Sequence, residues 1–199
     1  LDPARFISNR SSGKMGYSIA KAAWRRGAKV TLVSGPSSLP APFGIQRIRV
    51  ETAEEMQTAV NEHVDSADII IKSAAVSDFK PAIYHQQKVK KQSQEEGVVE
   101  LARTPDILNE LGKNKKSGQI LVGFAAESEN HLEEGRRKLQ QKNLDFIAVN
   151  NIASDITGFE ADTNKITLLS QSDTVELPFT SKEHTADLLF DSISRKLKN

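Results

Sequence analysis

The stretch DIIIKSAAVSDFKP, residues 68–81, combines an apolar run of strand length with a following turn of small and polar residues. A continuous apolar run such as 68–72 is typical of a strand buried on both faces of a parallel sheet. Open parallel sheets bind ligands beyond the carboxyl ends of their strands, which is where the small residues of this stretch lie. The stretch therefore predicts a buried strand that ends at a ligand site.

Strand-like and helix-like patterns alternate on both sides of this stretch. Further runs of strand length lie at 29–34, 45–51, 119–126 and 145–150. Patterns that favour helices lie at 14–26, 52–64, 104–112, 130–143 and 181–198. The runs 164–170 and 174–179 flank a short polar turn and predict an antiparallel hairpin. Together they predict one α/β domain over 1–199, with a Rossmann-like, mostly parallel sheet, helices on both faces and a C-terminal hairpin.

Cap signals mark several of the expected helix ends. Residues 52–55, TAEE, form a capping box, and Ser181 is the expected cap of the last helix. Thr104 is expected to cap a helix that has Pro105 at its first position. Gly27 follows the first helical pattern, as a glycine beyond a helix end commonly does.

Composition and charge exclude several classes of protein. The chain has 27 Lys and Arg against 26 Asp and Glu, a net charge of +1, which gives no electrostatic footprint for nucleic acid or an anionic membrane. No apolar run approaches the roughly 18 residues of a membrane span, and no signal-peptide pattern opens the chain. The absence of cysteine excludes disulfides, thiolate zinc sites and a cysteine nucleophile, and the four histidines show no paired spacing for a metal. We therefore expect a soluble, cytoplasmic protein.

The segment SNRSSGKMG, residues 8–16, places small residues just before a helix, where free backbone N–H groups favour a phosphate. It is not a Walker A loop, because Met15 follows Lys14, and it lacks the three glycines of a dinucleotide fingerprint. An NAD site would also require an acid where Ser34 ends the next strand. A turn that only caps the helix remains the alternative.

A helix that opens on a phosphate turn normally follows a strand, yet only LDPARFI precedes this one. Either Arg5–Ile7 is a very short strand, or the chain is an N-terminally truncated fragment without its first strand.

Further candidate site residues lie in the turn after the strand at 68–72 and on a later helix. Ala74 and Ala75 would let a flat base or sugar approach the backbone, and Asp78 could hold a ribose hydroxyl, a base amino group or a metal. A tight turn with a solvated Asp is the alternative. Lys138 and Lys142 share one helix face, a spacing also common on exposed helices.

The polar stretch 80–97 is long for a loop in a compact domain, so we expect a lid over about 82–97. Its KVKK segment, 88–91, could neutralise a polyphosphate, or be a solvated charge run. Tyr84 and Lys88 also match the YxxxK spacing of short-chain dehydrogenases. Those enzymes carry the pair on a long helix, whereas this stretch follows Pro81 and has little apolar face, so we interpret the match as coincidence.

Six motifs resemble those of the phosphopantothenoylcysteine synthetase family, in order from Pro3 to the last helix. They are ISNRSSGKMG (7–16), AAVSDFKP (74–81), KVKK (88–91), RTPDIL (103–108), GFAAE (123–127) and DITGFEADTNKI (155–166). The resemblance is to the form found as the C-terminal domain of a bacterial bifunctional coenzyme A protein, which also carries a flavin-dependent decarboxylase. That family begins with a strand and a GGT turn just before the point where this chain starts.

The resemblance implies a ligase that joins 4′-phosphopantothenate to L-cysteine. CTP would activate the carboxylate as an acyl-cytidylate with release of pyrophosphate, Mg²⁺ would assist, and the cysteine amine would then displace CMP. It also implies a homodimer whose partner helps close the phosphopantothenate site. The late hairpin, 164–179, offers an edge for such pairing. The alternative class is an NADP-dependent short-chain-type reductase, which only the YxxxK spacing and the Rossmann-like layout favour.

Matched position by position, the resemblance also implies site residues, but no metal ligands. The nucleotide-binding positions are Lys72, Ser73, Ala74, Asp78, Lys88, Pro105, Asp106, Ile107, Leu108, Phe124, Lys138 and Lys142. The substrate-binding positions are Asn9, Ser11, Ser12, Gly13 and Ala75. Asn9, which would handle the acyl-cytidylate, and Lys88 are the implied catalytic residues.

Overall fold

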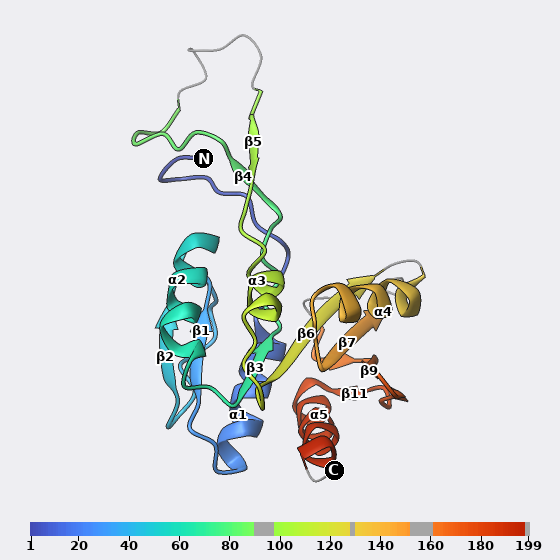
Figure 1. Cartoon of the computed structure of the whole chain (residues 1–199). Coiled ribbons are helices and arrows are strands. Elements are labelled where there is room, and N and C mark those ends of the chain that lie inside the picture. The colour runs from blue at the N-terminus through green and yellow to red at the C-terminus, as the bar shows by residue number, and fades with distance from the viewer. Residues whose placement is uncertain (90–97, 128–129, 152–160, 198–199) are drawn as a thin grey trace.

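The structure, a computed structural model, describes residues 1–89, 98–127, 130–151 and 161–197 (Figure 1). Its helices are α1 (Lys14–Arg25), α2 (Ala53–Val64), α3 (Ile107–Lys113), α4 (His131–Gln141) and α5 (Lys182–Leu197). The first strands are β1 (Thr31–Ser34), β2 (Gln46–Arg49), β3 (Ile69–Lys72), β4 (Phe79–Pro81), β5 (Leu101–Arg103) and β6 (Ile120–Glu127). The later strands are β7 (Phe146–Asn151), β8 (Thr163–Asn164), β9 (Ile166–Ser170), β10 (Thr174–Glu176) and β11 (Thr180–Ser181).

The central sheet has the strand order β10-β9-β7-β6-β3. Strands β3, β6 and β7 are parallel, whereas β9 pairs antiparallel with β7 and forms the expected hairpin with β10. Strands β1 and β2 form a separate parallel pair. The α/β fold with a mostly parallel sheet and a late antiparallel hairpin is thus confirmed.

Side chains that alternate along β6 and β7 build a core on each face of the sheet. Ile120 and Val122 of β6 pack with α1 and α5, whereas Leu121 points to the face that α2, α3 and α4 cover. In β7, Ala148 packs on the face covered by α1 and α5, and Val149 packs on the opposite face. Burial on both faces explains why these strands are continuously apolar, and it confirms helices on both faces.

Two cap predictions are confirmed. The Thr52 hydroxyl accepts the amide of Glu55 at 3.1 Å in a complete capping box at the start of α2. Ser181 Oγ accepts the amide of His184 at 3.2 Å at the start of α5.

The predicted start of α3 is wrong by two residues. Thr104 is held outside the helix, because its hydroxyl donates to the Ser77 carbonyl at 2.5 Å and its amide donates to the Asp78 carbonyl at 3.0 Å. Asp106 caps the helix instead, accepting the amide of Asn109 at 3.1 Å. An Asp carboxylate at this position satisfies one of the helix's unpaired N–H groups.

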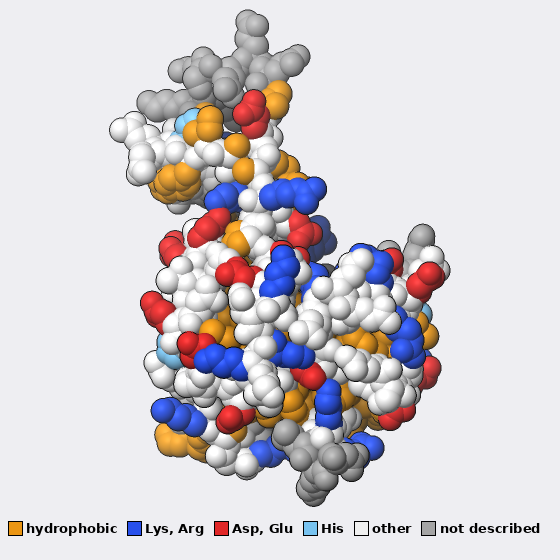
Figure 2. Space-filling view, viewed as in Figure 1, with side chains coloured by type: hydrophobic (Ala, Val, Ile, Leu, Met, Phe, Trp, Pro, Cys, Tyr) orange, Lys and Arg blue, Asp and Glu red, His pale blue; other side chains and the backbone are white. Residues whose placement is uncertain are grey.

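Strands β4 and β5 form an antiparallel ribbon that the sequence did not predict. Together with residues 82–89, which are irregular, and 98–100, this ribbon is called the arm below. The arm stands away from the body (Figures 1 and 2), and the N-terminal segment lies beside it (Figure 1). Residues 90–97, the rest of the expected lid, lie outside the described residues.

Arg5–Ile7 does not form the short strand that the sequence allowed; Asp2 and Arg5 instead make an isolated bridge in a tight turn. No described strand joins β1 to β3, so the β1–β2 pair is separate from the central sheet. A cavity lies between β1 and β3 and is lined by residues of both of these strands.

Candidate nucleotide and substrate site

The cavity has a volume of about 2020 Å³ and extends beyond the carboxyl ends of β3 and β6 to the start of α1. Thirteen of the expected site residues line it: Asn9, Ser11, Gly13, Lys72, Ser73, Ala74, Ala75, Asp78, Ile107, Leu108, Phe124, Lys138 and Lys142. The four expected residues outside this lining are Ser12, Lys88, Pro105 and Asp106. Residues more than 100 positions apart in the chain thus border the same cavity.

Glycines shape the turn that opens α1. Gly13 is the N-cap residue, with a φ of 77° that favours glycine, and the Ser12 hydroxyl accepts the amide of Lys14 at 3.4 Å. Gly16 faces Ser73: a Cβ at Gly16 would lie 3.0 Å from Ser73 Oγ. The start of α1 can therefore lie directly against the turn that follows β3.

Side chains from three segments hold the turn after β3. The Lys72 ammonium donates to the Ala74 carbonyl at 3.2 Å, and Asn9 Nδ2 donates to the Ala75 carbonyl at 3.2 Å. The Thr104 hydroxyl holds the next part of the turn through Ser77. The turn is therefore fixed in shape, and Asn9 is placed beside it.

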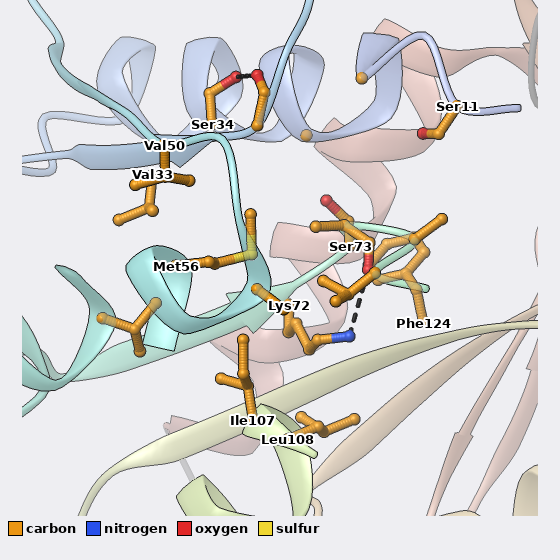
Figure 3. A pocket seen from close by; sticks show the side chains of 18 of the residues that line it. Ser11, Val33, Ser34, Val50, Met56, Lys72, Ser73, Ile107, Leu108 and Phe124 are labelled. Carbon is orange, nitrogen blue, oxygen red and sulfur yellow. Dashed lines mark hydrogen bonds between the residues drawn. The ribbon is translucent and has the colours of Figure 1, made fainter. Parts of the chain in front are cut away.

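Figure 3 shows Lys72 between Ser73 and Phe124 on one side and Ile107 and Leu108 on the other. Ile107 and Leu108 are buried in the core, so the half-buried Phe124 ring is the apolar side chain of this group that a base or sugar could lie on, next to the half-buried cation of Lys72.

Lysines and carboxylates are paired around this part of the cavity. Lys142 Nζ lies 2.8 Å from Asp106 Oδ2, and Lys138 forms an ion pair with Glu127. Burial raises the pKa of Asp106, but the bonds from Lys142 and from a backbone N–H outweigh it and leave the pKa below its usual value. Burial, and then the nearby Lys142, lower the pKa of Lys72. Two neighbouring cations make this region favourable for an anion.

Lys88 lies on the arm, exposed, and is not brought together with the other nucleotide-binding residues. Tyr84 and Lys88 lie on irregular backbone. The pair therefore lacks the helix on which the reductase alternative depends.

Sequence reasoning missed the contribution of the C-terminal region. Asn164 and Lys182 line the cavity, and Lys14 Nζ lies 2.6 Å from Asp162 Oδ1. Lys14 and Asp162 are too far apart in the chain for any spacing rule to connect them. The available signal was the motif that contains Asp162 and Asn164; its residues 155–160 lie outside the described residues.

The described residues contain no group of three or more His, Asp or Glu that could hold a metal ion. Near the cavity, Asp106 and Glu127 are engaged by lysines, and Asp78 is an exposed carboxylate. This donor set makes no closed metal site, but it would accommodate an ion such as Mg²⁺ that arrives with substrate phosphates and keeps most of its water, and Asp78 is the residue that would hold it. None of the described helices combines the length and hydropathy needed to cross a membrane.

A parallel sheet whose strands end at a cavity with lysines and a glycine-opened helix defines a Rossmann-like site for a phosphorylated ligand. The chain belongs to the family described as DNA/pantothenate metabolism flavoprotein, C-terminal domain, whose profile matches residues 1–197.

Curated relatives agree with this assignment. The chain is 45% identical over 195 residues to the coenzyme A biosynthesis bifunctional protein CoaBC of Escherichia coli K12, covering 97% of this chain and 48% of that protein. It is 48% identical over 185 residues to CoaBC of Bacillus subtilis 168, covering 92% and 45%. The chain thus spans about half the length of the curated relatives it matches.

Among solved structures, the C-terminal domain of a CoaBC protein superposes with a TM-score of 0.84 at 38% identity. The match covers 100% of this chain and 89% of that one. The described part of the chain therefore has the fold of this domain.

Proposed function

We propose that this chain ligates 4′-phosphopantothenate to L-cysteine with CTP, through an acyl-cytidylate, and yields 4′-phosphopantothenoyl-L-cysteine, CMP and pyrophosphate. The observation that carries the proposal is that Asn9, the Gly13 turn and three lysines, Lys72, Lys138 and Lys142, line one cavity that extends beyond the strand ends. Family membership supports a role in pantothenate metabolism.

The reaction needs activation because a carboxylate is a poor acylating agent. Esterification to CMP supplies a good leaving group, and charge that develops on phosphate oxygens must be met by cations and N–H groups. In this proposal the lysines and the start of α1 bind the phosphates, and Mg²⁺ bound with CTP neutralises part of their charge. When CTP binds, its phosphates would replace Asp106 as the ion-pair partner of Lys142 and Glu127 as the ion-pair partner of Lys138.

Asn9 serves the second half of the reaction in this proposal. Its amide can donate to a developing oxyanion and accept from an amine, and its position beside Ala75 keeps it at the turn where the acyl group would lie. Ser11, Ser12 and Gly13 continue this substrate-binding surface.

We further propose that the protein assembles as a homodimer and that the full-length protein also carries a flavin-dependent decarboxylase domain. The relatives, whose name calls them bifunctional, are about twice as long as this chain. The mass of the native gene product tests the fusion.

CTP should be preferred over ATP. Cytosine presents an amino donor beside a ring acceptor, and backbone groups near Ala74 and Phe124 can pair with that edge. A mismatched base would leave buried polar groups unpaired, at a cost of about 1–3 kcal/mol each. Comparable kcat/KM values for the two nucleotides would contradict this selectivity.

The test of the reaction is detection of the intermediate. With CTP, Mg²⁺ and 4′-phosphopantothenate but no cysteine, we expect pyrophosphate release and an acyl-cytidylate by mass spectrometry; adding cysteine should convert it to product and CMP. A thermal shift with NADPH and none with CTP and Mg²⁺ would favour the reductase instead.

A further inference from the structure

The Asp2 carboxylate is buried within a tight turn of the N-terminal segment. It accepts the amides of Ala4 and Arg5 at 2.9 and 3.0 Å. The Arg5 guanidinium donates to its other oxygen through Nε at 3.1 Å and Nη2 at 2.5 Å. The Arg5 guanidinium, with these backbone N–H groups, holds the pKa of Asp2 well below its usual value despite burial. The pair is therefore a rigid, charged unit.

The Asp2–Arg5 pair binds both the backbone N–H and the backbone C=O of one arm residue, Val89. The Val89 amide donates to Asp2 Oδ2 at 3.2 Å, and Arg5 Nη2 donates to the Val89 carbonyl at 3.2 Å. A third contact lies nearby, where the His85 amide donates to the Leu1 carbonyl at 3.0 Å. The N-terminal segment therefore holds the arm on both sides of Lys88.

Two contacts to one residue restrain the backbone more than a single bond would, and hydrogen bonds to charged groups are the stronger ones. Val89 directly follows Lys88, whose own side chain is exposed. Holding Val89 therefore sets where the Lys88 side chain starts and in which direction it leaves the arm. Val89 lies outside β4 and β5, the two three-residue strands of the arm, so their pairing does not fix it.

We propose that Asp2, with Arg5, is a positioning residue that holds the backbone at Val89 and thereby aims Lys88 at the nucleotide. The proposal rests on the proposed function and on the catalytic role that the family resemblance implies for Lys88, which here is to assist the release of pyrophosphate from CTP. Asp2 touches no reacting group and acts through Lys88.

The experiment uses the full-length protein with Asp2→Asn, which keeps the shape of the side chain and removes its charge. We expect the single-turnover rate of pyrophosphate release to fall roughly tenfold to a hundredfold, as misplacement of a catalytic group does. Attack of cysteine on acyl-cytidylate already formed should keep its rate. Asp65→Asn, which breaks an exposed ion pair with Lys116 on the body, is the matched control and should leave both rates unchanged.

A double-mutant cycle separates positioning from a structural role. If Asp2 acts through Lys88, Asp2→Asn should cost nothing further in a Lys88→Gln background, where the small residual rate of pyrophosphate release is followed with labelled CTP over long reaction times. An undiminished loss in that background, or an unchanged rate in Asp2→Asn alone, overturns the proposal. If Asp2→Asn does not fold, Arg5→Gln removes the contact to the Val89 carbonyl and goes through the same cycle. Absence of pyrophosphate release from the wild-type protein would instead overturn the proposed function.

Discussion

At the scale of single residues, Asn9 and Lys88 differ in how the structure holds them. Asn9 is bonded to the Ala75 carbonyl and lines the cavity, whereas Lys88 is exposed on the arm and outside that lining. A neutral, fixed amide suits the orientation of an acyl group. A mobile full charge suits a triphosphate whose charge moves as pyrophosphate leaves.

We therefore expect the two residues to fail at different stages. Asn9→Asp should still release pyrophosphate and accumulate acyl-cytidylate with cysteine present, because removing one positioned donor slows a step by roughly a hundred- to a thousandfold. Lys88→Gln should stall before the intermediate forms. Quenched single-turnover assays with labelled CTP measure both stages. Arrest of both variants at the same stage would show that this division of roles is wrong.

At the scale of secondary-structure elements, Asp145 connects β6 of the central sheet with α5 and with the segment that follows α3. Its carboxylate accepts the Leu121 amide of β6 at 2.8 Å, Lys196 of α5 at 2.7 Å and Lys115, which follows α3, at 3.0 Å. Burial raises the pKa of Asp145, but these three donors outweigh it and leave the pKa below its usual value. The ionised form therefore contributes to stability.

Asp145→Asn should lower the free energy of unfolding by about 2 kcal/mol at pH 7, because charged hydrogen bonds are lost at a mostly buried site. A carboxyl with a lowered folded pKa contributes fully above its unfolded value of about 4 and loses the contribution as pH falls through the folded pKa. The gap between wild type and Asp145→Asn should therefore shrink in acid. Urea unfolding at neutral and acid pH measures it, with Asp65→Asn as the exposed control. A gap that is constant with pH would contradict the assignment.

Gly112 lets α3 approach the end of α4. A Cβ at Gly112 would lie 1.8 Å from the Lys142 carbonyl oxygen, and Asn143 Nδ2 donates to the Gly112 carbonyl at 2.9 Å. Gly112→Ala should therefore separate the two elements, lower stability by about 1–3 kcal/mol or more and raise the KM for CTP, because Lys142 moves with the turn. Thermal unfolding and steady-state kinetics check both effects. Lys113→Ala, at an exposed position of the same helix, is the control, and an equal effect there would refute the packing explanation.

The sequence predicted the elements whose signals are local. The apolar runs of β6 and β7 and the capping box of α2 depend on neighbouring residues, and each is confirmed. The start of α3 was missed because Thr104 is held by Ser77, a contact that no local pattern reveals. The arm was missed because β4 and β5 are each only three residues long and because β4 contains Pro81.

The site could be predicted only in part for the same reason. Spacing indicated that Lys138 and Lys142 share a face, and the strand-end rule indicated the turn around Ala74, which lines the cavity. The partners of these lysines, Asp106 and Glu127, come from other elements and appear only in the folded chain.

At the scale of the whole molecule, the arm and the body divide the expected site. The arm carries exposed apolar side chains at Phe79, Ile83, Tyr84, Val98, Val99 and Leu101. Ile83 is 61% and Val98 74% exposed on an element that stands away from the body. The hairpin edge that the sequence suggested for pairing is a short strand with Thr174 and Glu176 exposed. The arm is therefore the better surface for a second copy of the chain.

We expect a dimer at micromolar concentration that depends on the arm. Ile83→Asp combined with Tyr84→Asp should give a folded monomer, because charges replace apolar side chains at the contact. Phe43→Asp, at an exposed apolar position on the body, should leave the mass unchanged. Light scattering after size exclusion measures the masses, and circular dichroism checks the fold. A monomeric wild-type protein would contradict this expectation.

Since Lys88 lies outside the cavity of its own chain, we expect it to complete the site of the partner. Mixing Asn9→Asp with Lys88→Gln subunits tests this directly. In a mixed dimer, a site built across the two chains would receive the wild-type Asn9 of one subunit and the wild-type Lys88 of the other. Random mixing of subunits in a two-fold dimer should then restore about a quarter of wild-type activity, although each variant alone is inactive. If Lys88 serves its own chain, every site keeps one altered residue and mixing restores nothing.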